Sequence, residues 1–185
     1  MGKKNQNKNS PTAKAPANKT PAKKTAAKKA PELRCFLIPV ANSYLLLPNT
    51  TVAEVLEFEK PAALDKTPDW VLGHIVWEGW QVPVVDYAEL IDMDGNKPKA
   101  SDRIIIVKSL MEGQRIPYIG IRASGLPTLT TLNEAGIKEQ PVKNRVLGLH
   151  SQVSVGKKTA IIPDLDRLGQ LIAHAAYGAL PLTRA

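Results

Sequence analysis

The segment from Gly73 to Leu90, GHIVWEGWQVPVVDYAEL, holds one histidine, two glutamates, one aspartate and two tryptophans among valines and isoleucines. Acidic and imidazole side chains could act as general acids and bases if they met in a cleft. Their positions favour structural roles instead. Asp86 precedes Glu89 by three residues, which is the spacing of a helix N-cap. Glu78 and Gly79 separate two β-type runs, so Gly79 is expected to take the positive φ of a tight turn.

No other motif brings catalytic or metal-binding groups to a productive spacing. The segment SVGKKT at 154–159 matches a phosphate-binding loop only in part, because that pattern requires a glycine where Ser151 stands. A hairpin turn at Gly156–Lys157 explains the segment better. The three histidines form no paired-ligand pattern; they are His74, His150 and His174. We therefore expect a protein that is not an enzyme and that has no cofactor and no metal site.

Short β-type runs bounded by Gly, Pro, Asn, Asp and Lys fill the chain from Leu33 onward, which predicts a mainly antiparallel β domain. Prolines cannot donate to a ladder, so the runs that hold Pro39, Pro83 and Pro117 are expected at sheet edges or bulges. A longer helix is expected from Asp164 to about Tyr177, with one apolar face made of Leu165, Leu168, Leu171, Ile172 and Ala175. The predicted strands are 35–40, 44–48, 52–58, 73–77, 80–85, 103–107, 115–121, 145–155 and 159–163.

The two halves of this β region resemble each other. VWEGWQVPVVDYAEL and VSVGKKTAIIPDLDRL both run strand, glycine turn, apolar strand, aspartate and helix start. RCFLIPVANSYLLLP and RIIIVKSLMEGQRIP are both strand–turn–strand units that begin at an arginine. The repeat predicts two similar β subdomains, at 33–92 and 102–172, joined by the polar linker 93–101.

The first 31 residues contain nine lysines, no acid, no aromatic residue and no Leu, Ile or Val, so we expect a disordered tail. The net charge of +8 belongs to this tail, because the rest of the chain has 25 − 9 = 16 basic residues against 17 acidic ones. Such a tail can keep the protein soluble, tether it to an anionic surface, or bind nucleic acid by counterion release. The lack of an apolar leader or membrane span, and the single Cys35, indicate a cytoplasmic protein.

The apolar residues of the opening segment allow two interpretations. Ile75 and Trp77 fall on one face of the first strand, with Trp80 just across the turn. Large aromatic residues usually belong to a core, but tryptophans that flank a hairpin tip can also be exposed anchors for a protein partner.

The region from Val52 to Leu90 resembles the CheW-like family, the coupling modules of bacterial chemosensory arrays. The resemblance rests on Val52-Ala-Glu54-Val55, Pro68, Gly73, Gly79, Pro83, Val84 and Asp86, and it extends more loosely over 33–172. It implies a CheW-like domain at about 32–180, built from two five-stranded SH3-like barrels on a common core. It also implies a non-catalytic adaptor that links chemoreceptor tips to the regulatory domain of a histidine kinase, with protein partners and no small-molecule substrate.

Two departures from the family pattern set this chain apart. Glu78 stands where the family usually has an arginine before the hairpin glycine, and Arg122 stands where it usually has an aspartate. We expect these two residues to form a compensating ion pair. The departures favour a divergent branch, similar to the ChpC-like proteins of twitching-motility systems. The residues expected to bind the partner are Val52, Glu54, Gly73, Ile75, Trp77, Glu78, Gly79, Val82, Pro83, Asp86 and Arg122.

Overall fold

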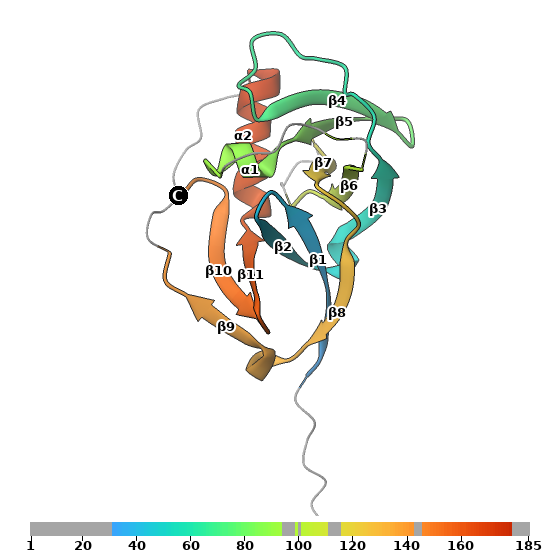
Figure 1. Ribbon diagram of the computed structural model, residues 1–185. Coiled ribbons are helices and arrows are strands. Elements are labelled where there is room, and N and C mark those ends of the chain that lie inside the picture. Colours follow the sequence, from blue (N-terminus) through green and yellow to red (C-terminus); the bar gives the residue numbers. More distant parts are fainter. Residues whose placement is uncertain (1–30, 94–98, 100, 111–115, 143–145, 179–185) are drawn as a thin grey trace, which may run out of the picture.

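The structure is a computed structural model that describes residues 31–93, 99, 101–110, 116–142 and 146–178. Residues 1–30 and most of the linker lie outside this description, so the predicted disorder of the tail is not tested. Within the described part, the strands form one six-stranded and one five-stranded sheet, with few helices (Figure 1). The prediction of a mainly β fold with a C-terminal helix is confirmed.

The first sheet has the strand order β8-β1-β2-β11-β10-β9 and the second has the order β3-β6-β7-β5-β4. Neighbouring strands are antiparallel except for the parallel pairs β2 with β11 and β5 with β7. The strands of the first sheet are β1 (Leu33–Val40), β2 (Ser43–Pro48), β8 (Thr128–Leu132), β9 (Ile137–Gln140), β10 (Leu149–Val155) and β11 (Lys158–Pro163). Those of the second sheet are β3 (Val52–Glu57), β4 (Val71–Trp77), β5 (Trp80–Val85), β6 (Arg103–Lys108) and β7 (Tyr118–Ala123).

The predicted boundary between the subdomains does not coincide with the sheets. Strands β6 and β7 follow the linker, yet β6 pairs with β3 and β7 pairs with β5, in the sheet that β3, β4 and β5 form before the linker. The first sheet likewise joins β1 and β2 to strands from the end of the chain. The division into 33–92 and 102–172 is therefore wrong for the sheets, because strand exchange between the halves is a long-range choice that local patterns do not show.

The internal repeat itself has a clear counterpart in the topology. The β1–β2 hairpin occupies the same place in the first sheet as β6–β7 does in the second. The β10–β11 hairpin corresponds to β4–β5 in the same way, and each is followed by a helix, α2 (Leu165–Tyr177) or α1 (Tyr87–Leu90). The halves repeat in order, but they are interleaved in space.

Alternation along the strands sorts their side chains between three clusters. In β6, Ile105 and Val107 face a large core shared by both sheets and α2, whereas Ile104 and Ile106 face the inside of the second sheet. A third cluster, which includes Cys35 and Val153, fills the inside of the first sheet. Burial there raises the pKa of the Cys35 thiol, as expected of a packed hydrophobic residue.

Strands β8 and β9 were not predicted from the sequence. Their segments, TLTTL and IKEQ, are short, and both lie at edges of the first sheet, where exposed polar residues replace a clear apolar face. The expectation that the proline-containing runs are edge strands or carry bulges is also corrected, because β1, β5 and β7 have no register shift of their own. Pro39 and Pro83 lie in the interior strands β1 and β5, outside the residues that pair with one of the two neighbours. The pairing of β1 with β8 ends at Leu37, and the pairing of β5 with β7 begins at Val84. Pro117 immediately precedes β7.

The two predicted helix starts are confirmed. Asp164 Oδ1 accepts a hydrogen bond from Arg167 N at 2.9 Å and caps α2, which ends at Gly178 in the left-handed conformation. The apolar face of α2 is rotated slightly from the prediction. Leu165, Leu168 and Ile172 are buried as expected, but Gly169 and Ala173 join them in place of Leu171 and Ala175.

Candidate functional site: an aromatic and acidic end of the second sheet

A group of aromatic and acidic side chains gathers at one end of the second sheet, and we call this group the aromatic end. It consists of Glu54, Trp77, Glu78, Trp80 and Tyr118. Trp77 ends β4, Trp80 begins β5 and Tyr118 begins β7, so the antiparallel and parallel pairings bring these strand ends together. The strand ends come from both halves of the sequence.

A side-chain hydrogen bond links the two edges of the second sheet at this end. Trp77 Nε1, on edge strand β4, donates to Glu54 Oε2, on edge strand β3, at 2.6 Å. A register shift in β3 turns Glu54 to this side. Val52 pairs with Val107 and packs on the shared core, whereas Glu54 pairs with Ile106, which faces the inside of the sheet. The short bulge thus gives the two residues different surroundings.

The aromatic rings pack edge to face around Tyr118. Its ring centroid lies 4.8 Å from that of Trp77 and 6.1 Å from that of Trp80. Trp77 is half-buried, but 47% of Trp80 and 72% of the neighbouring Val76 are exposed. The sequence left core and surface roles open for the tryptophans, and the structure assigns Trp77 to a partly covered position and Trp80 to the surface.

Glu78 and Gly79 form the two-residue turn between β4 and β5. Both have positive φ, 49° and 79°, as a type I′ turn requires. The predicted conformation of Gly79 is confirmed, and the side chain of Glu78 is exposed at the tip. The second predicted turn, Gly156–Lys157, also joins two paired strands, and Gly156 has a φ of 60°.

Several residues expected at the partner surface are buried. Ile75 and Val82 lie in the cluster inside the second sheet, with exposures of 5% and 1%, so their expected role as apolar contacts is wrong. Pro83 is buried as well. Gly73 is needed for a contact within the chain, because a Cβ on it would lie 2.2 Å from the carbonyl oxygen of Ala62. Alternation and the approach of residues 61–63 explain these differences.

Asp86 and Arg122 belong to a buried ionic network at the opposite end of the sheet. Arg122 forms ion pairs with Asp86 and with Asp102, the latter at 3.4 Å from Nη1 to Oδ2. Asp86 Oδ1 also accepts from Ala88 N and Glu89 N, which confirms the predicted cap of α1. The carboxyl group therefore holds a helix start and a guanidinium together.

The predicted ion pair between Glu78 and Arg122 is wrong. Ile121 pairs with Val85, so Arg122 lies beside Asp86 at the end of β5. Glu78 lies beyond the other end of β5, and the strand from Trp80 to Val85 alone spans about 16 Å. The parallel pairing of β5 with β7 places Arg122 far from Glu78. No local feature of the sequence predicts that pairing.

Sequence reasoning also missed Tyr118 and Val76 as members or neighbours of this site. The alternation Tyr118-Ile119-Gly120-Ile121 would have placed Tyr118 on the face opposite the isoleucines. Its proximity to the two tryptophans, however, depends on the β5–β7 pairing, which joins segments about 35 residues apart.

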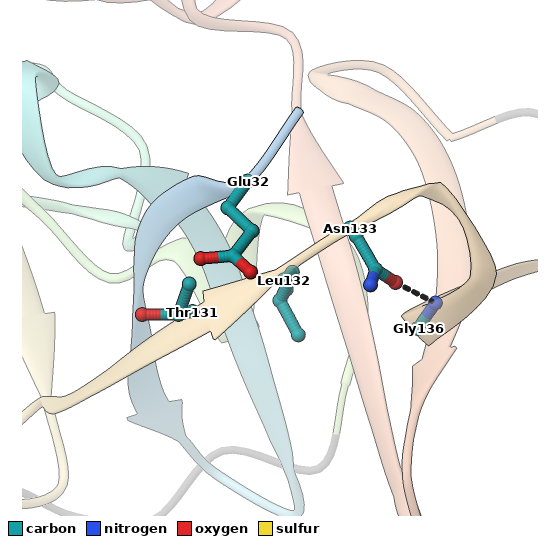
Figure 2. Close-up of a pocket in the computed structure, with 5 residues that line it drawn as sticks. All are labelled: Glu32, Thr131, Leu132, Asn133 and Gly136. Carbon is teal, nitrogen blue, oxygen red and sulfur yellow. Dashed lines mark hydrogen bonds between the residues drawn. The ribbon is translucent and has the colours of Figure 1, made fainter. Parts of the chain in front are cut away.

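The described part of the chain contains several cavities. One, of about 370 Å³, is lined by Glu32, Thr131, Leu132, Asn133 and Gly136 (Figure 2). Asn133 Oδ1 accepts there from Gly136 N at 3.0 Å, which caps a 3-10 turn. Among the described residues, no cluster of His, Cys, Asp and Glu could hold a metal ion. Nor does this part of the chain contain a helix with the length and apolarity to cross a bilayer.

A family model described as the CheW-like domain matches residues 34–173. The chain belongs to the CheW-like domain family. The CheW-like match covers β1 to most of α2 and so includes both interleaved sheets. It confirms the family resemblance seen in the sequence.

A CheW fold is also found among solved structures. The scaffolding protein TtCheW from Thermoanaerobacter tengcongensis is similar, with a TM-score of 0.64 and 20% sequence identity over 82% of this chain and 99% of that one. At this identity the likeness concerns the fold. A search of curated proteins found no match.

Proposed function

We propose that this CheW-like protein is a non-catalytic, cytoplasmic adaptor in a bacterial chemosensory system, where it couples methyl-accepting chemoreceptors to a histidine kinase. The observation that carries the proposal is the aromatic end of the second sheet, in a chain whose family match covers both sheets. In this proposal the aromatic end binds the regulatory domain of the kinase. The departures at Glu78 and Arg122 favour a twitching-motility system.

The exposure of the aromatic end suits a protein partner. Trp80 and Val76 offer apolar area on the hairpin, and tryptophan is among the residues that contribute most to protein interfaces. Tyr118 supports the ring of Trp80, and the bond between Trp77 and Glu54 fixes the strand ends. A surface that is already ordered loses little conformational entropy when a partner covers it.

The partner residues expected from the sequence fall into two groups in this proposal. Glu54, Trp77, Glu78 and Gly79 lie at the surface or partly so and are proposed contacts, together with Trp80. Of the buried residues, Ile75 and Val82 hold the site in place because they pack beneath the hairpin. Asp86 and Arg122 lie at the opposite end of the sheet and are not contacts in this proposal. Val52 is half-buried against the shared core, so a substitution there would test stability together with binding.

Binding of the purified regulatory domain of the organism's own chemosensory kinase tests the proposal. Trp80→Ala should weaken binding at least about tenfold, which corresponds to ~1.4 kcal/mol, with little loss of stability because the side chain is half exposed. Leu126→Ala is the matched control, since Leu126 is 67% exposed and follows β7 at the other end of the sheet. Equal affinity of the wild type and the Trp80 variant would remove the aromatic end from the kinase interface.

Deletion of residues 1–31 separates this proposal from a nucleic-acid-binding function of the lysine-rich tail. An adaptor without the tail should keep its affinity for the kinase domain. A protein that acts through its lysines should instead lose a nucleic-acid affinity that falls steeply with salt. Loss of kinase binding on deletion would contradict the adaptor surface described above.

A further inference from the structure

We propose that the aromatic end recognises a cationic side chain, an arginine or lysine of a folded protein partner, held between the carboxylates of Glu54 and Glu78 and against the ring of Trp80. The inference rests on the proposed function in using the same surface, and it adds the chemistry that the partner must present.

The two glutamates reach the aromatic end from different elements, one strand and one turn. Glu54 reaches the site from β3, and its Oε2 is held by Trp77 Nε1. Glu78 lies at the tip of the β4–β5 turn, and Trp77 and Trp80, which pair directly with each other, adjoin the turn on both sides. Within the described part of the chain, neither glutamate forms an ion pair.

One basic residue of the described part also lies near this end. Lys108 ends β6, pairs with Tyr118 in the strand register and is exposed. No ion pair joins it to Glu54 or Glu78. Among the described residues, two acidic groups against one basic group give the aromatic end an excess of negative charge.

This excess determines what can cover the surface. A partner that buries Trp80 and Val76 also removes water from the nearby carboxylates, and an unpaired carboxylate in an interface weakens binding. A cation on the partner offsets that cost by pairing with the carboxylates. It also gains from the face of the tryptophan ring, over which a guanidinium stacks well.

The lysine-rich tail of a second copy is the competing source of cations. Residues 1–31 have no aromatic residue and no Leu, Ile or Val, so they could pair with the glutamates but could not cover Trp80 and Val76 with apolar area. The exposed apolar area therefore favours a folded partner over the tail.

Photo-crosslinking in the cells of origin tests the inference without a partner chosen in advance. A photoreactive phenylalanine analogue replaces Gln81 in the full-length chain, since Gln81 is exposed, uncharged and adjacent to Trp80. The adduct is digested and its attachment site is mapped by mass spectrometry. We expect one main adduct, attached within a few residues of an arginine or lysine of another protein.

Charge variants in the same background give the decisive comparison. Glu78→Lys should reduce the adduct at least fivefold, and changing the mapped basic residue of the partner to glutamate should restore it. Glu89→Lys is the control, because Glu89 is also exposed but lies on α1 at the other end of β5. Thermal unfolding of each variant excludes a loss of the fold.

Four results would overturn the inference: no adduct, an adduct unchanged by Glu78→Lys, an attachment site remote from any basic residue, or attachment to residues 1–31 of a second copy. An adduct with the expected charge dependence on a protein that is neither a kinase nor a receptor would support the cation site while it refutes the proposed function. The two proposals therefore fail separately.

Discussion

Arg122 is the residue on which the buried charges of the second sheet depend. It is 7% exposed and pairs with two buried carboxylates, those of Asp86 and Asp102. A buried ion pair adds little stability over a well-packed apolar core, but removal of one partner leaves the others unpaired in a low-dielectric region. The network therefore keeps β5, β6 and β7 in register, because any shift of one strand would leave a buried charge unpaired.

Arg122→Met should lower the free energy of unfolding by about 3–5 kcal/mol, because it leaves Asp86 and Asp102 buried without a counter-charge. Urea denaturation followed by tryptophan fluorescence measures the change. Arg103→Met is the control, since Arg103 is half exposed and donates to the backbone oxygens of Ser101 and Asp102. A loss below about 1 kcal/mol for Arg122→Met would show that the network is dispensable.

Tyr87 links α1 to the loop before β10, where its hydroxyl donates to Gly148 O at 2.7 Å. Burial raises the pKa of Tyr87, and the carboxylate of Asp164 raises it further. The folded state thus favours the neutral phenol more than the unfolded state does. This contribution to stability is fully present below the unfolded pKa of about 10 and is lost as the pH rises above it.

Tyr87→Phe should lower the free energy of unfolding at neutral pH by about 0.5–1.5 kcal/mol, because the hydrogen bond to the Gly148 carbonyl is lost while that oxygen still accepts from Asp164 N. Between about pH 9 and pH 11, the melting temperature of the variant should fall less than that of the wild type. Thermal melts across this range compare the two proteins. Parallel pH profiles would mean that Tyr87 does not contribute to the alkaline loss of stability.

At the scale of elements, the β4–β5 hairpin contains two glycines that meet different structural requirements. Gly79 has a φ of 79° at an open turn, with nothing within 4 Å of an added Cβ. Gly73 has a φ of 132°. The next residue, His74, forms two backbone hydrogen bonds with Ala62, one from each amide to the other's carbonyl oxygen. The segment at 61–63 thus covers part of the outer edge of β4.

Gly73→Ala should destabilise the fold by about 3 kcal/mol or more, since strain at positive φ adds to a clash with backbone. Gly79→Ala should cost only about 1 kcal/mol, because it meets strain without a clash. Chemical denaturation ranks the two variants. An equal or smaller loss for Gly73→Ala would contradict the close packing of residues 61–63 on β4.

At the scale of the whole molecule, the interleaving of the halves makes the two sheets depend on each other. Each sheet takes strands from both sides of the linker, and the shared core contains residues of both sheets and of α2. Neither half can complete a sheet or bury its apolar faces alone. We therefore expect one cooperative unfolding transition for residues 32–178.

Fragments 32–92 and 102–178, each expressed separately, should be unfolded. Far-ultraviolet circular dichroism and the dispersion of amide proton signals measure this, with 32–178 as the folded control. An equimolar mixture of the two fragments should regain signal dispersion, because the strands exchanged between halves are then all present. A cooperative melt of either fragment alone would refute the interdependence of the two sheets.

Local features of this protein follow from its sequence, since they depend on neighbouring residues. The turn at Glu78–Gly79, the caps at Asp86 and Asp164, and most strands have signals within a few positions of the chain. The family pattern from Val52 to Leu90 likewise lies in the sequence, and the internal repeat indicated two similar β units. The edge strands β8 and β9 were not predicted because their residues are mostly exposed and show no clear apolar alternation.

Only the tertiary structure decided which strands share a sheet and which side chains share a site. The parallel pairing of β5 with β7 places Arg122 beside Asp86 and Tyr118 beside Trp80, and so separates Glu78 from the cation predicted for it. The physical reason is that pairing between distant segments depends on burying all apolar faces of the chain together. That requirement acts on the whole chain at once, so no short stretch of residues contains it.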